Sequence, residues 1–219
     1  MDSKVSTIET RVNLSRYYQL ALLLGLFTVV YNLGEGVVSI AFGAHDQALT
    51  LFGFGLDSFI ECISGLGIVA MTLRIRSHPD DARSPFEKTA LRITGASFYL
   101  LAAGLLATAV YNVFAGHKPE TTLSGLIVSL ISIAVMGALV YFKTQVGQKL
   151  NSQPILADAA CSKVCIYMSL VLLAASAVYQ LTGFGFVDSL GALGLIYFAV
   201  SEGREAFEKA SGADPCDDD

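Results

Sequence analysis

Six long apolar runs constrain this chain more than any other feature of its sequence. A helix rises about 1.5 Å per residue, so about 20 apolar residues cross the roughly 30 Å of bilayer hydrocarbon. Backbone amides in lipid must be hydrogen-bonded within their own segment, so we interpret every run as a transmembrane helix. In chain order the runs are Leu20–Phe42, Leu49–Leu73, Leu91–Phe114, Leu123–Phe142, Ile155–Leu181 and Phe184–Val200.

Composition supports a membrane protein and excludes other classes. The 219 residues are 53% hydrophobic and 15% charged, whereas about 25% of the residues in a soluble domain are charged. A soluble enzyme is therefore excluded, and the formal net charge of -5 argues against a nucleic-acid partner. We expect an all-α polytopic protein with a cytoplasmic N-terminal segment over residues 1–16, a six-helix membrane domain over 17–210 and a disordered acidic tail over 211–219.

Basic residues predict the orientation in the membrane. They precede the first run, follow the sixth, and lie in the second and fourth connections, whereas the opposite side carries only Lys118. Lysine and arginine concentrate on the cytoplasmic side of membrane proteins, so we expect both termini to be cytoplasmic. The polar stretches Arg74–Phe86 and Lys143–Pro154 are predicted as cytoplasmic connections.

Ionisable side chains inside the predicted helices are costly in lipid and mark candidate functional sites. Asp57 and Glu61 are four residues apart, so both carboxylates lie on one face of the second predicted helix. Cys161 and Cys165 repeat this spacing on the fifth. The two helices run in opposite directions and both pairs lie near the bilayer midplane. We therefore expect Asp57 to face Cys165 and Glu61 to face Cys161.

Thiolates and carboxylates together are ligands for tetrahedral ions such as zinc. Sulfur shifts the preference towards zinc, cadmium, mercury or monovalent copper and away from magnesium and manganese. Four ionised ligands exceed the charge of a dication, so some must be protonated without the metal, and metal entry then releases protons. The sequence predicts that Asp57, Glu61, Cys161 and Cys165 bind a transported cation in exchange for protons, with no other cofactor.

Three further ionisable side chains are candidates for the surroundings of this site. Glu35, about halfway along the first predicted helix, is an outer-shell acid, a proton acceptor or a member of a salt bridge. Lys163 neutralises Glu35 or Asp158 across helices, or reaches towards the cytoplasm; a salt bridge from Lys163 to Asp57 is the alternative to a metal site. Asp158, near the start of the fifth helix, is expected to line the cytoplasmic mouth.

Packing is the alternative interpretation for the cysteines and for the small residues. Cys62 adjoins Glu61 but points about 100° away around the helix, so we interpret it as a packing residue. Small residues on the third and sixth predicted helices indicate close helix contacts, including a dimer contact. They are Ala103, Ala107, Gly191 and Gly194.

At these residues the chain resembles the cation diffusion facilitator family. LDSFIE (Leu56–Glu61) is similar to the family's acidic pair on its second helix, and ADAACSKVC (Ala157–Cys165) is similar to the frame of its second motif. Residues Phe186–Ala210 are similar to its sixth helix and the start of the following segment. The likeness covers about residues 15–210. It implies six helices, cytoplasmic termini and proton-coupled export of zinc or a related divalent metal.

The chain departs from the family pattern in three respects. Glu61 stands where the family has a second aspartate, and Cys161 and Cys165 stand at the usual histidine and aspartate positions. We also expect the family's cytoplasmic metal-binding domain to be absent, because the sequence ends at Asp219, shortly after Val200.

We expect a homodimeric integral protein of a bacterial inner membrane that exports a soft or borderline divalent cation by proton exchange. Zinc and cadmium are the expected cargo, held between the second and fifth helices, with mercury and monovalent copper as further candidates. Two alternatives stay open: a carrier that takes up a soft metal, and a metal-binding membrane sensor or accessory protein that does not transport.

Overall fold

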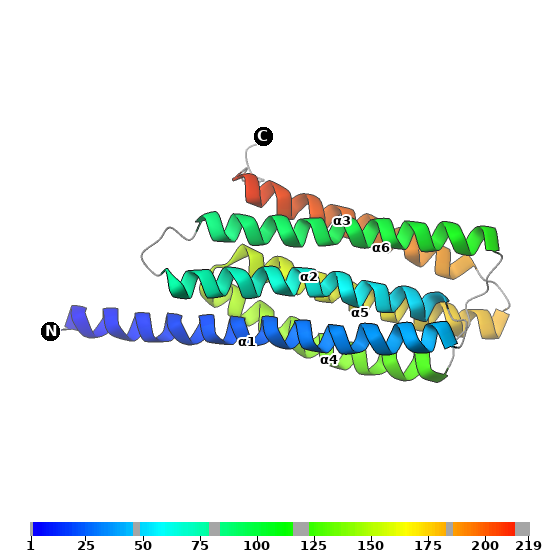
Figure 1. The fold of residues 1–219 in the computed structure, drawn as a ribbon, viewed down its shortest axis with the longest axis horizontal. Helices are drawn as coiled ribbons and strands as arrows, with labels where there is room; N and C mark the ends of the chain where they lie inside the picture. Colours follow the sequence, from blue (N-terminus) through cyan, green and yellow to red (C-terminus); the bar gives the residue numbers. More distant parts are fainter. Residues whose placement is uncertain (1, 46–48, 79–83, 116–122, 183–185, 213–219) are drawn as a thin grey trace.

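The structure, a computed structural model, describes residues 2–45, 49–78, 84–115, 123–182 and 186–212. These residues form six helices and no strand, arranged as an elongated antiparallel bundle (Figure 1). The helices are α1 (Asp2–His45), α2 (Leu49–Ser77), α3 (Ser84–Ala115), α4 (Leu123–Leu150), α5 (Gln153–Thr182) and α6 (Phe186–Ser211). The predicted all-α polytopic architecture is confirmed.

Five of the helices contain segments that are long and apolar enough to cross a membrane. These segments are Leu14–His45, Leu51–Ser77, Pro85–Tyr111, Gly125–Leu150 and Gln153–Val171. The part of α6 whose side chains the structure describes contains no such segment. The sixth predicted span begins within 183–185, outside the described residues.

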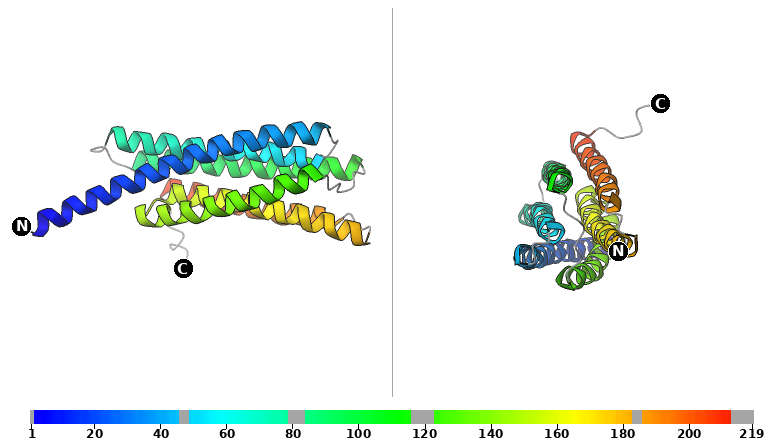
Figure 2. Two further views of the ribbon diagram at one scale, coloured as in Figure 1. Left: turned by 90° about the horizontal axis from the view of Figure 1, so that it is seen from below. Right: turned by 90° about the vertical axis from the view of Figure 1, so that its right-hand side faces the viewer.

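The helices extend further than the apolar runs. Most of the predicted segment 1–16 is the beginning of α1, which projects beyond the other helices (Figure 2), and the predicted tail lies outside the described residues from 213 onward. The long connection predicted over Lys143–Pro154 is wrong. Lysine and glutamine are good helix formers, so α4 continues through this polar stretch and α5 begins at Gln153.

A tight turn joins α4 to α5. Asn151 adopts the left-handed conformation with φ 49°, which asparagine tolerates at the end of a helix. The amide of Ser152 donates a hydrogen bond of 2.9 Å to the carbonyl oxygen of Gly147 and so closes the last turn of α4. Because residues at equal distance from such a turn face each other, Lys143 is placed level with the stretch of α5 that contains Asp158.

Helices α2 and α5 form the centre of the bundle. Of the residues in their apolar segments, 61% and 56% are buried, against 28–33% for the segments of α1, α3 and α4. Helix α2 packs on α1, α3 and α5, while α5 packs on α2, α3, α4 and α6. The two helices that carry the acidic and cysteine pairs are therefore neighbours in the interior.

Glycines allow α1 and α2 to approach closely. A Cβ atom on Gly55 would lie 2.9 Å from both the carbonyl oxygen of Gly36 and the backbone nitrogen of Ile40. Backbone atoms at that distance cannot move aside without shifting a helix. This contact aligns α1 beside α2 along the level of Asp57.

Glycines also bring α3 and α6 together. A Cβ on Gly203 would lie 3.3 Å from the carbonyl oxygen of Gly95. Within the chain, Ala103 and Ala107 are exposed and Gly194 meets nothing within 4 Å, so these three make no close helix contact there, and the dimer contact stays a prediction. Side-chain packing at Gly191 lies outside the described part of the structure.

We predict that Gly55→Ala lowers the stability of the protein in detergent by about 1–3 kcal/mol, because the added methyl group overpacks the α1–α2 contact. Gly34→Ala on α1 is the matched control. A methyl group there meets nothing within 4 Å, so its stability should not fall. Thermal unfolding of the purified variants measures both effects, and an equal loss in the two variants would contradict the packing argument.

Candidate metal centre

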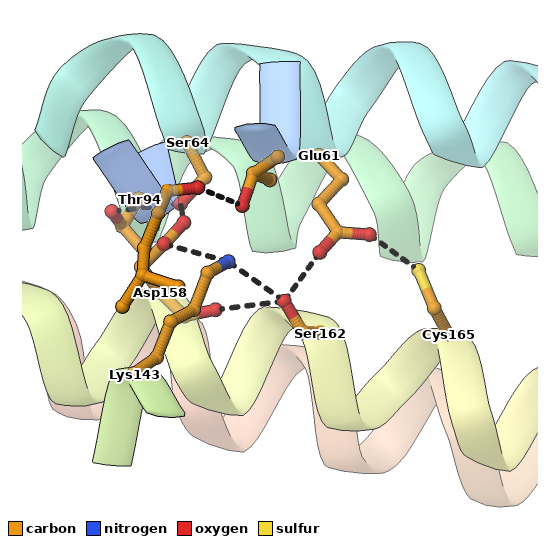
Figure 3. Close-up of polar contacts among 9 residues, drawn as sticks. Glu61, Ser64, Thr94, Lys143, Asp158, Ser162 and Cys165 are labelled. Carbon is orange, nitrogen blue, oxygen red and sulfur yellow. Dashed lines mark hydrogen bonds and ion pairs between the residues drawn. The ribbon is translucent and has the colours of Figure 1, made fainter. Parts of the chain in front are cut away.

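Asp57 and Glu61 project from α2 towards α5 in the interior of the bundle, where their exposed fractions are 3% and 0%. The Sγ atom of Cys165, on α5, lies 2.9 Å from Asp57 Oδ2 and 2.9 Å from Glu61 Oε2. The contact with Glu61 is visible in Figure 3. The structure thus brings three of the four predicted ligands into direct contact, and we call Asp57, Glu61 and Cys165 the acid–thiol cluster.

The acid–thiol cluster has a proton requirement. A thiol carries one hydrogen, which can point at only one of the two carboxyl groups at a time. The second contact is satisfied when that carboxyl group carries a proton and donates it to the sulfur. These two contacts are those expected of a cluster in which one carboxyl group is protonated.

The expected pairing of Glu61 with Cys161 is not what the structure shows. The second oxygen of Glu61, Oε1, accepts a hydrogen bond of 2.5 Å from Ser162 Oγ. Cys161 is buried in an apolar cluster with Phe98 and Val164. Its thiol is nevertheless close enough to interact electrostatically with Glu61, because it lies one turn below Cys165 on α5. The expected pairing fails because Cys165 lies between the two carboxylates and contacts both. Helix α5 is therefore shifted along α2 relative to the register that would pair each acid with its own cysteine.

Cys62 packs against α1, as expected from its direction on the helix. Its Sγ atom donates a hydrogen bond of 3.5 Å to the carbonyl oxygen of Val29. This thiol therefore points away from the acid–thiol cluster.

Glu35 lies beside the acid–thiol cluster and is held by hydroxyl groups. Its Oε1 accepts a hydrogen bond of 2.9 Å from Tyr31 Oη, and its Oε2 accepts one of 3.1 Å from Ser58 Oγ. Ser58 adjoins Asp57, so Glu35 is one residue removed from the cluster. In the described part of the chain Glu35 has no lysine partner, and the salt-bridge interpretation is wrong for this residue. The interpretations as an outer-shell acid or a proton acceptor stay open.

Asp158 does not line a mouth, because it is only 1% exposed. Its Oδ2 lies 2.8 Å from Nζ of Lys143, which is equally buried, and its Oδ1 accepts a hydrogen bond of 2.7 Å from Ser64 Oγ. Nζ of Lys143 also donates a hydrogen bond of 2.9 Å to Ser162 Oγ. Burial of the carboxylate is tolerated because a cation and a hydroxyl group neutralise and solvate it.

The predicted ion pairs of Lys163 are not formed, whereas its predicted reach towards the cytoplasm stays a prediction. Its side chain is exposed, and among the described residues it forms no ion pair with Glu35, Asp57 or Asp158. The partner of Asp158 is Lys143, the first residue of the predicted connection Lys143–Pro154. The sequence does indicate that Lys143 is helical, because no proline, asparagine or aspartate interrupts the chain between Leu123 and Leu150.

Residues 25–212 match the family described as the cation efflux transmembrane domain. The chain belongs to the cation efflux family. It is also similar to an uncharacterized transporter of Methanocaldococcus jannaschii, with 26% identity over 67% of this chain and 56% of that protein. An uncharacterized transporter of Synechocystis sp. is 23% identical over 76% of this chain and 56% of its own length. The chain therefore spans about half the length of these relatives.

Membership in the cation efflux family makes this an integral membrane protein of a transporter family. Ionisable groups within membrane helices mark ion pathways, so membership in this family makes the polar residues buried between α2 and α5 candidates for such a pathway. The acidic pair and the cysteine pair both lie within the matched residues.

The acid–thiol cluster is closed in this structure. Among the described residues, no group of three or more His, Cys, Asp or Glu side chains has an arrangement that could hold a metal ion as it stands. Zinc bonds to sulfur and oxygen in a tetrahedral site hold those two atoms about 3.6 Å apart, whereas the S···O separations here are 2.9 Å. A cation of the zinc type therefore requires each contact to widen by about 0.7 Å as it replaces the hydrogens.

We predict that Lys143→Met lowers the free energy of unfolding by about 3–5 kcal/mol, because it leaves the buried Asp158 without its cation. Lys149→Met removes the same charge from an exposed position near the end of α4 and should change stability by less than about 0.5 kcal/mol. Thermal or denaturant unfolding in one detergent compares the two. Equal stabilities would show that the ion pair contributes nothing to the fold.

Proposed function

We propose that the protein is a proton-coupled efflux transporter of a soft or borderline divalent metal cation, with zinc or cadmium as its cargo. The observation that supports this best is the position of a thiol between two buried carboxyl groups, at the contact of the two central helices. Carboxylate and thiolate together bind zinc-like ions, and sulfur favours cadmium, mercury and monovalent copper over magnesium.

In this proposal Asp57, Glu61 and Cys165 supply three ligands, and Cys161 supplies the fourth. Cys161 lies one helical turn further along α5, in electrostatic range of both acids. A small rotation of α5, or a different rotamer of Cys161, would turn its thiol towards Glu61. Glu35 would then stand behind the ligand Asp57 and hold it in place through Ser58.

Proton exchange follows from the chemistry of these ligands. Cysteine binds metal as a thiolate and the acids bind it as carboxylates, so a cation can enter the cluster only as hydrogens leave. Protons that return from the opposite side of the membrane would displace the metal by the same exchange. The closed, protonated cluster is the proton-loaded state of this cycle, and the widened cluster is its metal-loaded state.

We predict that purified protein in liposomes couples a zinc or cadmium gradient to proton movement, and that Asp57→Asn reduces this flux at least tenfold. The variant keeps the size of the side chain but removes an anionic ligand. Glu205→Gln removes an exposed carboxylate from α6 and should leave the flux unchanged. A pH-sensitive dye inside the vesicles reports the proton flux, and a metal-sensitive dye reports the cation.

The outcomes separate the proposal from its alternatives. A protein that binds cadmium without any flux would be a sensor or accessory protein. Cadmium flux that occurs only with the proton gradient reversed from the one expected for export would indicate uptake. Flux that survives in Asp57→Asn would place the cation elsewhere in the bundle.

We predict that Cys165→Ser weakens cadmium binding more than zinc binding, by about tenfold or more, because a hydroxyl replaces the soft ligand. Cys161→Ser should have the same direction and a smaller effect, since Cys161 is outside the cluster in this structure. Cys62→Ser, whose thiol faces α1, is the matched control. Competition titrations of the two metals against a chromophoric chelator measure the ratio. An unchanged ratio in both Cys161→Ser and Cys165→Ser would disprove thiol ligation.

A further inference from the structure

A buried network extends from the acid–thiol cluster along α5, from Cys165 past Ser162 to Asp158 (Figure 3). It joins four helices through side chains that are almost completely inaccessible. Its members are Ser64 on α2, Thr94 on α3, Lys143 on α4, and Asp158 and Ser162 on α5. The sequence-based hypotheses did not include Lys143 in any site, and the metal ligands proposed above do not account for it.

The donors of this network have a defined direction. The three hydrogens of the ammonium group at Lys143 can only be donated, and two of them serve Asp158 and Ser162. Ser162 accepts from Lys143, so its single hydrogen is free to be donated to Glu61 Oε1. The positive charge of Lys143 is thereby connected to a metal-ligand carboxylate through one hydroxyl group.

The ammonium group of Lys143 makes a second contact besides its ion pair with Asp158. Oδ1 of Asp158 already accepts from Ser64, and Oδ2 takes the ammonium group itself. A buried ammonium group needs acceptors for its hydrogens, and besides Asp158 one of them is Ser162, whose own hydrogen goes to Glu61. Contacts of 2.9 and 2.5 Å lead from Nζ of Lys143 to Glu61, so a dication on that carboxylate lies within about 10 Å of a buried positive charge.

We propose that Lys143 is a built-in cation that lowers the affinity of the acid–thiol cluster for its metal ion, so that a bound dication can be released. Lys143 is a positioning residue, since it acts through Ser162 and through its charge without touching the metal. This inference rests on the proposed function, because it concerns the same cation site. In the low-dielectric interior the repulsion between the ammonium group and the metal is weakly screened.

Asp158 has the opposite effect on the cluster, because it offsets the charge of Lys143. The two single variants should therefore change cation affinity in opposite directions. Asp158→Asn leaves the ammonium group unbalanced and should weaken cadmium binding by about tenfold or more. Lys143→Met leaves a carboxylate unbalanced and should strengthen binding by a similar factor. The double variant Lys143→Met/Asp158→Asn carries neither charge and should bind cadmium more tightly than both Asp158→Asn and the wild type, because the repelling ammonium group is gone.

The experiment is calorimetric titration of cadmium into the purified protein and its variants in detergent, with Lys149→Met as the charge control. Transport in liposomes adds a second readout. Lys143→Met should lower both the cadmium concentration at half-maximal flux and the maximal flux itself, because binding tightens and release slows. A role in folding alone would reduce the amount of active protein without moving the half-maximal concentration.

The outcomes are distinguishable from failure of the proposed function. Wild-type protein that binds no cadmium would overturn the proposed function and this inference together. If the wild type binds cadmium and Asp158→Asn binds it equally well, only the inferred role of Lys143 is overturned. The same holds if Asp158→Asn and the double variant both bind cadmium more weakly than the wild type by the same factor. If Lys143→Met does not fold, the comparison of Asp158→Asn with the charge-free double variant still decides the sign of the effect.

Discussion

The burial of carboxyl groups between α2 and α5 is the constraint on which the rest of the structure depends. An isolated carboxylate in such an interior is strongly unfavourable, so each must be protonated, hydrogen-bonded or paired with a cation. Asp57 and Glu61 meet the thiol of Cys165, while Asp158 meets the ammonium group of Lys143. The two carboxyl environments are stabilised in different ways. Asp57 and Glu61 depend on hydrogens that can exchange, whereas Asp158 depends on the ammonium charge of Lys143. The charge of the acid–thiol cluster can therefore change, while that of the neighbouring ion pair stays the same.

The packing of the bundle fixes the positions of these carboxyl groups and of their partners. Glycine contacts between α1 and α2 fix the depth of Asp57, and the turn at Asn151 fixes Lys143 of α4 opposite Asp158 of α5. Helices in lipid gain no hydrophobic free energy from associating, so close packing and interhelical hydrogen bonds hold them together. The serine and threonine hydroxyls of the network are therefore both part of the fold and part of the site's electrostatics.

The helices and the acidic pair could be predicted from sequence, because hydropathy over about 20 residues and a four-residue spacing are local properties. The partner of each acid could not. Lys143 follows an apolar run directly, and only the length of α4 beyond that run decides whether its side chain points into the bundle. The register of Cys165 between Asp57 and Glu61 depends on how α2 and α5 cross, which no local pattern encodes. Sequence therefore located the candidate ligands but not the charge that accompanies them.

The network also bears on how the site could open. Ser64, Thr94, Lys143 and Ser162 connect α2, α3, α4 and α5 on one side of the acid–thiol cluster, whereas Glu35 and Ser58 connect α1 with α2 beside Asp57. A movement that separates α4 and α5 from α2 and α3 must break the bonds of Asp158 to Ser64 and of Ser162 to Glu61. The α4–α5 hairpin would keep the pair of Lys143 and Asp158 intact during that movement. The fixed charge would then move with α5, away from Glu61, and its influence on a bound cation would differ between the open and closed states.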